Sequence, residues 1–267
     1  MPVDQIGLIL LIACVVAMLS RRLRLPYSVG LVLAGVALTF LGASVKLSLT
    51  PELIYTVLLP PLIFEAALQL KWRPFRDNLP VTLTLAFPGV LVTGAVVASG
   101  MHLFIGWSWL GSALFGALIA ATDPVSVIAA FKEMKVESRL SLLVESESLL
   151  NDGAAAVAFA LLVALAQGQG LHVGAMTGLL AWMALGGVAV GSAVSAALLI
   201  LAGRTEDHLV EITLTTIAAY GSFLLAEHLH MSGVLAALAA GLVVGNVGWM
   251  GSISDVGREQ GTSFWDY

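Results

Sequence analysis

Long runs of apolar residues, separated by short polar connections, make up most of the chain. A run of about 20 apolar residues is long enough to cross the roughly 30 Å hydrocarbon core of a bilayer as a helix. The pattern predicts nine membrane spans, at residues 6–20, 27–42, 53–70, 79–104, 109–131, 140–166, 172–202, 209–229 and 232–249. We therefore expect an all-α polytopic membrane protein with no soluble domain between its helices.

The composition supports this class of protein. Hydrophobic residues make up 59% of the chain and charged residues 11%, and the mean hydropathy is +0.98. The single cysteine, Cys14, excludes a disulfide framework and a cysteine-based metal site. No basic segment or cleavage site precedes the first span, so we expect that span to be retained.

The basic residues lie almost entirely on one side of the predicted membrane. The connections after spans 1, 3, 5, 7 and 9 hold eleven of the twelve: Arg21, Arg22, Arg24, Lys71, Arg73, Arg76, Lys132, Lys135, Arg139, Arg204 and Arg258. Only Lys46 lies on the other side. Cytoplasmic loops carry the excess of lysine and arginine, so we expect a multi-pass protein of the plasma (inner) membrane with its N-terminus outside.

Small residues recur at four-residue spacing in the last span, at Gly233, Ala237, Gly241 and Gly245. This spacing predicts a stripe along which another helix packs closely. The first two spans and the last two also resemble each other loosely and would cross the membrane in opposite directions. Inverted repeats of this kind are typical of secondary transporters.

Three carboxylates, Glu65, Asp123 and Asp152, lie well inside apolar spans. Each would cost about 3 kcal/mol to insert as a charge, and no lysine or arginine lies inside a span to compensate. The missing counter-charge is then a proton, a bound cation or a basic residue further along the protein. Asp123 and Asp152 lie roughly 21 and 18 Å into spans of opposite direction, so both are expected near the midplane.

Asp123 belongs to the segment AATDPVSVIAA at residues 120–130. Pro124 lacks an N–H and disfavours helical geometry at Asp123, which predicts an opened helix. The Asp123 carboxylate, the Thr122 hydroxyl and freed backbone carbonyls are then oxygen ligands for a hard cation. The alternative is an ordinary proline kink in which Asp123 caps the second half-helix.

The segment ESESLLNDG at residues 145–153 places a second polar cluster inside an apolar run. Ser148 and Asp152 are four residues apart and share a helix face, so both could bind one ion. Asn151 could bridge to the opened helix. Glu147 is expected to pair with a basic residue outside this chain, and Glu145, nearer the cytoplasm, to be solvated.

Glu65 ends the segment LLPPLIFE at residues 58–65. It could contribute to the ion site, or extend toward Lys71 or Arg73 in the basic connection that follows. Other chemistries have no support in the sequence: the five histidines show no zinc-binding spacing, no phosphate-binding or hydrolase motif occurs, and Ser148 has no histidine in a relay position. We expect no enzyme activity, no cofactor and no nucleic-acid partner.

The three motifs LLPPLIFE, ATDPVSV and ESLLNDG, in this order, resemble those of the monovalent cation:proton antiporter-1 family, the sodium/proton exchangers. The likeness implies an inverted-repeat fold of thirteen transmembrane helices, with an unwound helix at the midplane. Residues 1–170 would form the first six-helix repeat, 171–203 a linker helix and 204–267 the start of a second, truncated repeat. The chain would then be the N-terminal two-thirds of a transporter, and we expect that it does not transport alone.

The resemblance also implies roles for single residues. Asp152 would be the carboxylate that binds either the proton or Na+, with Asp123 beside it as a second sodium ligand. Thr122, Ser148 and Glu65 would contribute further to the cation site. These assignments make the protein an antiporter in which both substrates compete for Asp152.

The remaining motif residues would shape the site. Asn151 would hold the two helices together, Pro124 would keep one of them open, and Glu147 would pair with an arginine in a later helix. In such antiporters an Asn–Asp pair, here Asn151–Asp152, goes with electroneutral exchange of one proton for one cation, and the family suggests a homodimer. A K+/H+ antiporter, or an uncoupled cation channel or sensor, stays open as an alternative.

Overall fold

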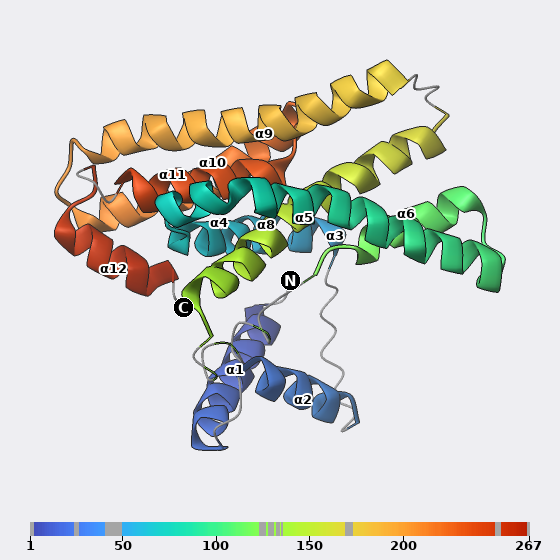
Figure 1. Cartoon of the computed structure of the whole chain (residues 1–267). Coiled ribbons are helices and arrows are strands. Elements are labelled where there is room, and N and C mark those ends of the chain that lie inside the picture. Colours follow the sequence, from blue (N-terminus) through green and yellow to red (C-terminus); the bar gives the residue numbers. More distant parts are fainter. Residues whose placement is uncertain are drawn as a thin grey trace. The chain divides into compact units, whose positions relative to one another are not determined.

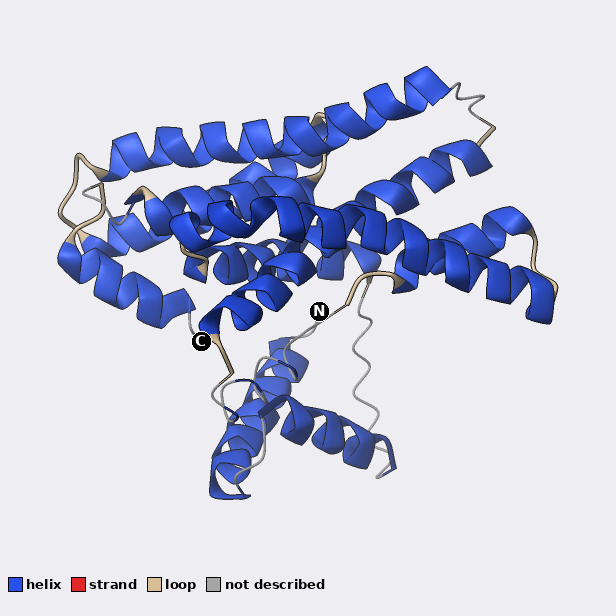
Figure 2. Ribbon diagram, viewed as in Figure 1, coloured by secondary structure: helices blue, strands red, loops and turns tan. Residues whose placement is uncertain are grey.

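Helices make up all the regular structure of the described residues, and no strand occurs among them (Figure 1, Figure 2). The computed structural model describes residues 3–23, 27–40, 50–122, 127, 131, 134, 136–168, 173–248 and 252–265. The elements are α1 (Val3–Leu23), α2 (Tyr27–Phe40), α3 (Pro51–Leu53), the π-helical η1 (Ile54–Leu58), α4 (Leu59–Gln69), α5 (Trp72–Gly100), the π-helical η2 (Met101–Ile105), α6 (Trp109–Ile119), α8 (Ser138–Ala166), α9 (Val173–Ala202), α10 (His208–His228), α11 (Gly233–Asn246) and α12 (Asp255–Trp265). The chain divides into two compact units, residues 1–51 and 52–267.

The predicted spans are confirmed as helices, since each of the nine contains one in the described part of the chain. Five helices are long and apolar enough to cross a membrane, and four shorter apolar helices accompany them. The predicted start of the fourth span at residue 79 is wrong, because α5 begins at Trp72. Pro74 lies in the first turn of α5, where its missing N–H removes no helical hydrogen bond.

In the first unit, α1 and α2 pack against each other as a helical hairpin. The second unit contains two groups of helices. In one group α5, α6 and α8 pack against one another, and in the other α11 packs against α4, α9 and α10, with α12 on α10 (Figure 1). Helix α8 also contacts α4, α9 and α11, so the helix that carries ESESLLNDG joins the two groups.

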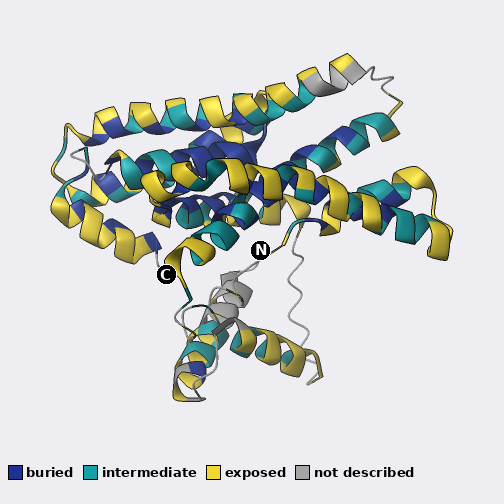
Figure 3. Cartoon of the chain, viewed as in Figure 1, coloured by how far each residue is buried: buried dark blue, intermediate teal, exposed yellow. Residues whose placement is uncertain are grey.

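Helix α11 lies at the centre of its group, and residues 233–241 are all buried (Figure 3). Its glycines allow the backbone of α4 to come close: a Cβ on Gly241 would lie 2.5 Å from the carbonyl oxygen of Phe64, and one on Gly245 would lie 2.2 Å from that of Leu68. The predicted small-residue packing stripe is therefore confirmed at these two glycines.

A double proline explains the π-helical turn before α4. Pro61 has no N–H to donate to the carbonyl of Val57, four residues earlier, so that carbonyl needs another partner. The hydroxyl of Tyr220 on α10 supplies it, with an O–O distance of 2.9 Å. Tyr55 in the same turn packs edge-on against Phe223 of α10, with ring centroids 5.2 Å apart. Helix α10 thus stabilises the turn that precedes the Glu65 helix.

Candidate functional site: a cation site at the α6–α8 junction

The polar cluster of ESESLLNDG faces the point where α6 stops. Helix α6 ends at Ile119, and Ala120 to Thr122 are not helical. The predicted opening of the fifth span is therefore observed just before Asp123 and Pro124, where α6 has already ended. Asp123 is the predicted cation ligand and Pro124 the predicted cause of the helix break. Both residues lie outside the described part of the chain.

Two side chains of α8 hydrogen-bond to Thr122. The Ser148 hydroxyl donates to the backbone carbonyl of Thr122, and Asn151 Nδ2 donates to the Thr122 hydroxyl at 2.9 Å. Ser148 and Asn151 are 4% and 2% exposed, whereas Thr122 is exposed, so buried donors on α8 meet an acceptor at the surface of the described bundle. Ser148 on α8 thus supplies a hydrogen-bond donor to the Thr122 carbonyl, which lies beyond the end of α6.

Asn151 makes a second contact on its own helix. Its Nδ2 also donates to Glu147 Oε1 at 3.0 Å, one turn earlier. The amide oxygen of Asn151 is buried, and no donor among the described residues reaches it. A buried acceptor without a partner is costly, which makes this oxygen a free ligand position within the cluster. Glu147 is half-buried, and the structure brings it to Asn151.

Asp152 is half-buried on α8, and it shares one helix face with Ser148 and Glu145. Its neighbour Gly153 determines how closely α11 approaches: a Cβ at this position would lie 2.5 Å from Leu235 Cδ2. A side chain at this position would have to displace the Leu235 side chain, so Gly153 allows α8 and α11 to pack closely.

Glu65 is half-buried on α4, a helix that contacts α8. Its Oε1 accepts a hydrogen bond from Gln69 Nε2 at 2.6 Å, one turn closer to the basic connection. Gln69 in turn lines the cavity described next.

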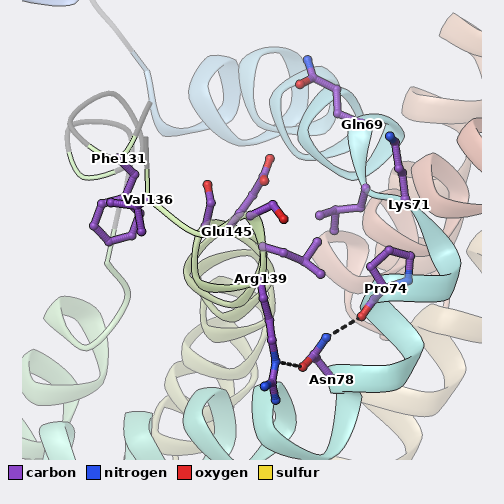
Figure 4. Close-up of a pocket in the computed structure, with 12 residues that line it drawn as sticks. Gln69, Lys71, Pro74, Asn78, Phe131, Val136, Arg139 and Glu145 are labelled. Atoms are coloured by element: carbon purple, nitrogen blue, oxygen red, sulfur yellow. Dashed lines mark hydrogen bonds between the residues drawn. The ribbon is translucent and has the colours of Figure 1, made fainter. Parts of the chain in front are cut away.

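A cavity of about 590 Å³ lies at the basic end of α4, α5 and α8 (Figure 4). Its polar lining includes Gln69, Lys71, Asn78, Arg139 and Glu145. Arg139 Nε donates to Asn78 Oδ1 at 3.0 Å, which ties α8 to α5. Glu145 lies seven residues before Asp152 on the same helix face, about 10 Å along the axis. The cavity therefore lies on the side of the cluster that the loop charges predict to be cytoplasmic.

Sequence reasoning missed two further carboxylates, both on α10. Glu211 is 1% exposed and accepts from the Ser254 backbone N–H at 3.0 Å and the Ser254 hydroxyl at 2.7 Å. Glu227 Oε1 accepts from the Tyr55 hydroxyl at 3.0 Å and the Gly233 N–H at 2.9 Å. Both lie near the ends of their span and meet the start of a following helix. The short distance in sequence from Glu227 to the SG that begins α11 could have indicated this contact.

The donor set is one of oxygens: a hydroxyl, an amide oxygen, backbone carbonyls and carboxylates. Within the part of the chain that the structure describes, no three His, Cys, Asp or Glu side chains gather as a transition-metal site would require. Neutral and anionic oxygens suit a hard cation. The arrangement of oxygens fits binding of an alkali cation or a proton.

A polytopic helical bundle that opens one helix against a buried polar cluster is the architecture of an ion-transport protein. The family model described as "Sodium/hydrogen exchanger, transmembrane" matches residues 8–264, and the chain belongs to this family.

Individual relatives support the same assignment. The chain is 37% identical over 270 residues to the Na(+)/H(+) antiporter ApNhaP of Aphanothece halophytica, covering 99% of this chain and 51% of the relative. It is 36% identical over 270 residues to the low-affinity Na(+)/H(+) antiporter NhaS1 of Synechocystis sp., with 99% and 51% covered. The chain therefore spans about half the length of these relatives.

A solved structure has the same fold. The sodium proton antiporter MjNhaP1 from Methanocaldococcus jannaschii superposes with a TM-score of 0.76 at 19% sequence identity. The match covers 99% of this chain and 66% of that one. The predicted antiporter fold is thus confirmed.

Proposed function

We propose that the protein carrying this chain exchanges Na+ for H+ across the membrane. Family membership and the names of the relatives support Na+ over K+. The observation that carries the proposal is the pair of α8 hydrogen bonds, from Ser148 and Asn151, to Thr122. They fix the Asp152 helix to the segment that leads directly into Asp123.

In this proposal Asp152 alternately binds Na+ and a proton. Either one neutralises a carboxylate inside a membrane protein, so the two compete for one group. Asp123, Thr122, Ser148 and Glu65 supply further oxygens. Coupling needs only that the loaded site be exposed in turn to each side of the membrane.

Other side chains hold the site together. Asn151 joins α8 to Thr122, Pro124 keeps the neighbouring helix open, and Glu147 orients Asn151. We also propose electroneutral exchange of one proton for one cation, a homodimer in the plasma membrane with its N-terminus outside, and transport without enzyme chemistry or a cofactor. Residues 1–170, 171–203 and 204–267 would be the first repeat, the linker helix and the start of the second repeat.

The decisive experiment replaces Asp152 by Asn in the complete gene product that contains these residues. In everted vesicles with an imposed pH gradient, the unmodified protein should dissipate the gradient when Na+ is added, and Asp152→Asn should not. The amide keeps the size of the side chain but binds neither a proton nor Na+ with the affinity of a carboxylate.

Asp77→Asn is the matched control, because it removes an exposed carboxylate from α5 and should leave exchange unchanged. Full exchange by Asp152→Asn at normal expression would refute the assignment. A current carried by Na+ without any proton movement would favour the channel alternative.

A further inference from the structure

A second groove, of about 590 Å³, lies between the start of α5 and the end of α11. Its apolar wall is formed by Leu242 and Val243 of α11 and by Val247, which directly follows α11. Lys71, Trp72 and Arg73 form the opposite rim. Lys71 and Pro74 border both this groove and the basic-side cavity, whereas the other residues of the groove do not line that cavity. We propose that this groove binds an anionic phospholipid, with the acyl chain along α11 and the headgroup at Lys71 and Arg73.

The groove is built by a polar clamp. Asn246 on α11 accepts from the Trp72 backbone N–H at 2.7 Å and donates to the Leu70 carbonyl at 2.9 Å. These bonds hold the α4–α5 turn against the last turn of α11. The two basic side chains are therefore fixed beside an apolar helix surface rather than carried on a free loop.

The charge of the rim calls for an anion. Lys71 and Arg73 are exposed, and neither makes an ion pair or a side-chain hydrogen bond within the described chain. The first turn of α5 contains no acidic residue, so the positive end of the helix dipole adds to their charge. A phosphate headgroup would neutralise both.

The apolar wall calls for hydrocarbon. Trp72 is 46% and Val247 51% exposed at the basic end of the helices. Tryptophan prefers the headgroup level of a bilayer, and lysine and arginine in cytoplasmic loops attract anionic lipid. An amphiphile with a negative headgroup and an apolar tail complements both the basic rim and the apolar wall of the groove. A free phosphate complements only the basic rim.

The test uses the complete gene product, purified and titrated with phosphatidylglycerol that carries bromine on its acyl chains, which quenches nearby tryptophan fluorescence. Brominated phosphatidylglycerol should quench more than brominated phosphatidylcholine, and Trp72→Phe should remove that difference. Lys71→Gln and Arg73→Gln should each raise the half-quenching concentration about fivefold, and together about thirtyfold.

Two further variants separate charge from shape. Arg76→Gln makes the same charge change on the same face of the membrane but outside the groove, and should shift the titration less than twofold. Val247→Phe fills the groove without changing charge, and should weaken quenching.

Equal quenching by the two lipids, or an equal effect of Arg76→Gln and Lys71→Gln, would overturn the proposal. Displacement of the brominated lipid by millimolar inorganic phosphate would overturn the proposal in favour of a free-anion site. If the protein dimerises without lipid and the dimer no longer shows quenching of Trp72, a second copy of the chain occupies the groove instead. Asp152→Asn should bind lipid normally, so failure here and failure of the antiport proposal are separate results.

Discussion

The close backbone approach of α4 to Gly241 on α11 makes a quantitative prediction for Gly241→Ala. An added Cβ would lie 2.5 Å from the Phe64 carbonyl oxygen and 2.8 Å from Ala67 Cβ. A carbon and a carbonyl oxygen normally lie about 3.3 Å apart or more. The helices must therefore separate by nearly 1 Å, and Phe64 directly precedes Glu65.

Overpacking of this kind typically costs about 1–3 kcal/mol, whereas alanine gains about 1 kcal/mol over glycine in a helix interior. We expect Gly241→Ala to lower the Tm in detergent and to reduce Na+-dependent exchange through the displacement of Glu65. Gly89→Ala in α5 is the control, because a Cβ there meets nothing within 4 Å. It should keep or raise the Tm.

The measurements are fluorescence-detected thermal melts of both variants and exchange in everted vesicles at matched expression. If Gly241→Ala melts at the same temperature as Gly89→Ala, the close contact is not present in solution, and the reasoning fails. If it melts lower but exchanges normally, the packing holds and the link to Glu65 is wrong.

Three smaller changes test the other contacts. Ser148→Ala removes the bond to the Thr122 carbonyl and should raise the Na+ concentration for half-maximal exchange about tenfold; an unchanged value would exclude Ser148 from the site. Glu145→Gln removes a carboxylate from the basic-side cavity and should raise the Na+ concentration for half-maximal exchange about threefold when Na+ is added from that side. High choline chloride should abolish this difference, because salt screens the charge. An equal effect from both sides of the membrane would contradict a role for Glu145 in attracting Na+. Tyr55→Phe removes the hydroxyl donor to Glu227 and should lower stability by about 1 kcal/mol in thermal melts, whereas no change would show that the bond contributes nothing.

Much of the fold was predictable because membrane insertion acts on sequence directly. Apolar runs predicted a helix in each of the nine spans, as the described residues show, and Pro124 predicted that the fifth span opens. The end of α6 as early as Ile119 was not predicted, because that span was expected to continue to residue 131. The start of α5 was not predictable in this way: the basic segment at 71–78 looks like a loop by hydropathy. It continues the helix because Pro74 is tolerated in a first turn and Asn246 holds the chain at Trp72.

The site was predictable in part for the same reason. Residues 148 and 151 can be placed on α8 from helical spacing alone, but their common partner at Thr122 depends on how two helices meet. The contact between Gly153 and Leu235 could not be predicted from the sequence either, because the two residues are more than eighty positions apart. Contacts between distant segments leave no periodic signal in a single sequence.

The two carboxylates of α10 are neutralised in a way that the sequence did not predict. For a carboxylate inside an apolar span the sequence predicts a proton, a cation or a basic side chain as the counter-charge. Glu227 and Glu211 instead accept backbone N–H groups at the starts of α11 and α12, where the helix dipole is positive. Helix termini are thus a fourth solution, available to carboxylates near the ends of a span.

Asp152 differs from these two carboxylates by its position. It lies in the interior of α8, a continuous helix from Ser138 to Ala166, whose own N–H groups are occupied by the helix. Among the described residues, Ser148 and Asn151 contact Thr122 just beyond the end of α6, and Ser148 meets a backbone carbonyl there. A carbonyl end attracts cations, not carboxylates. In the exchange that we propose, a proton or a cation neutralises Asp152, whereas backbone donors at helix starts serve the two carboxylates of α10.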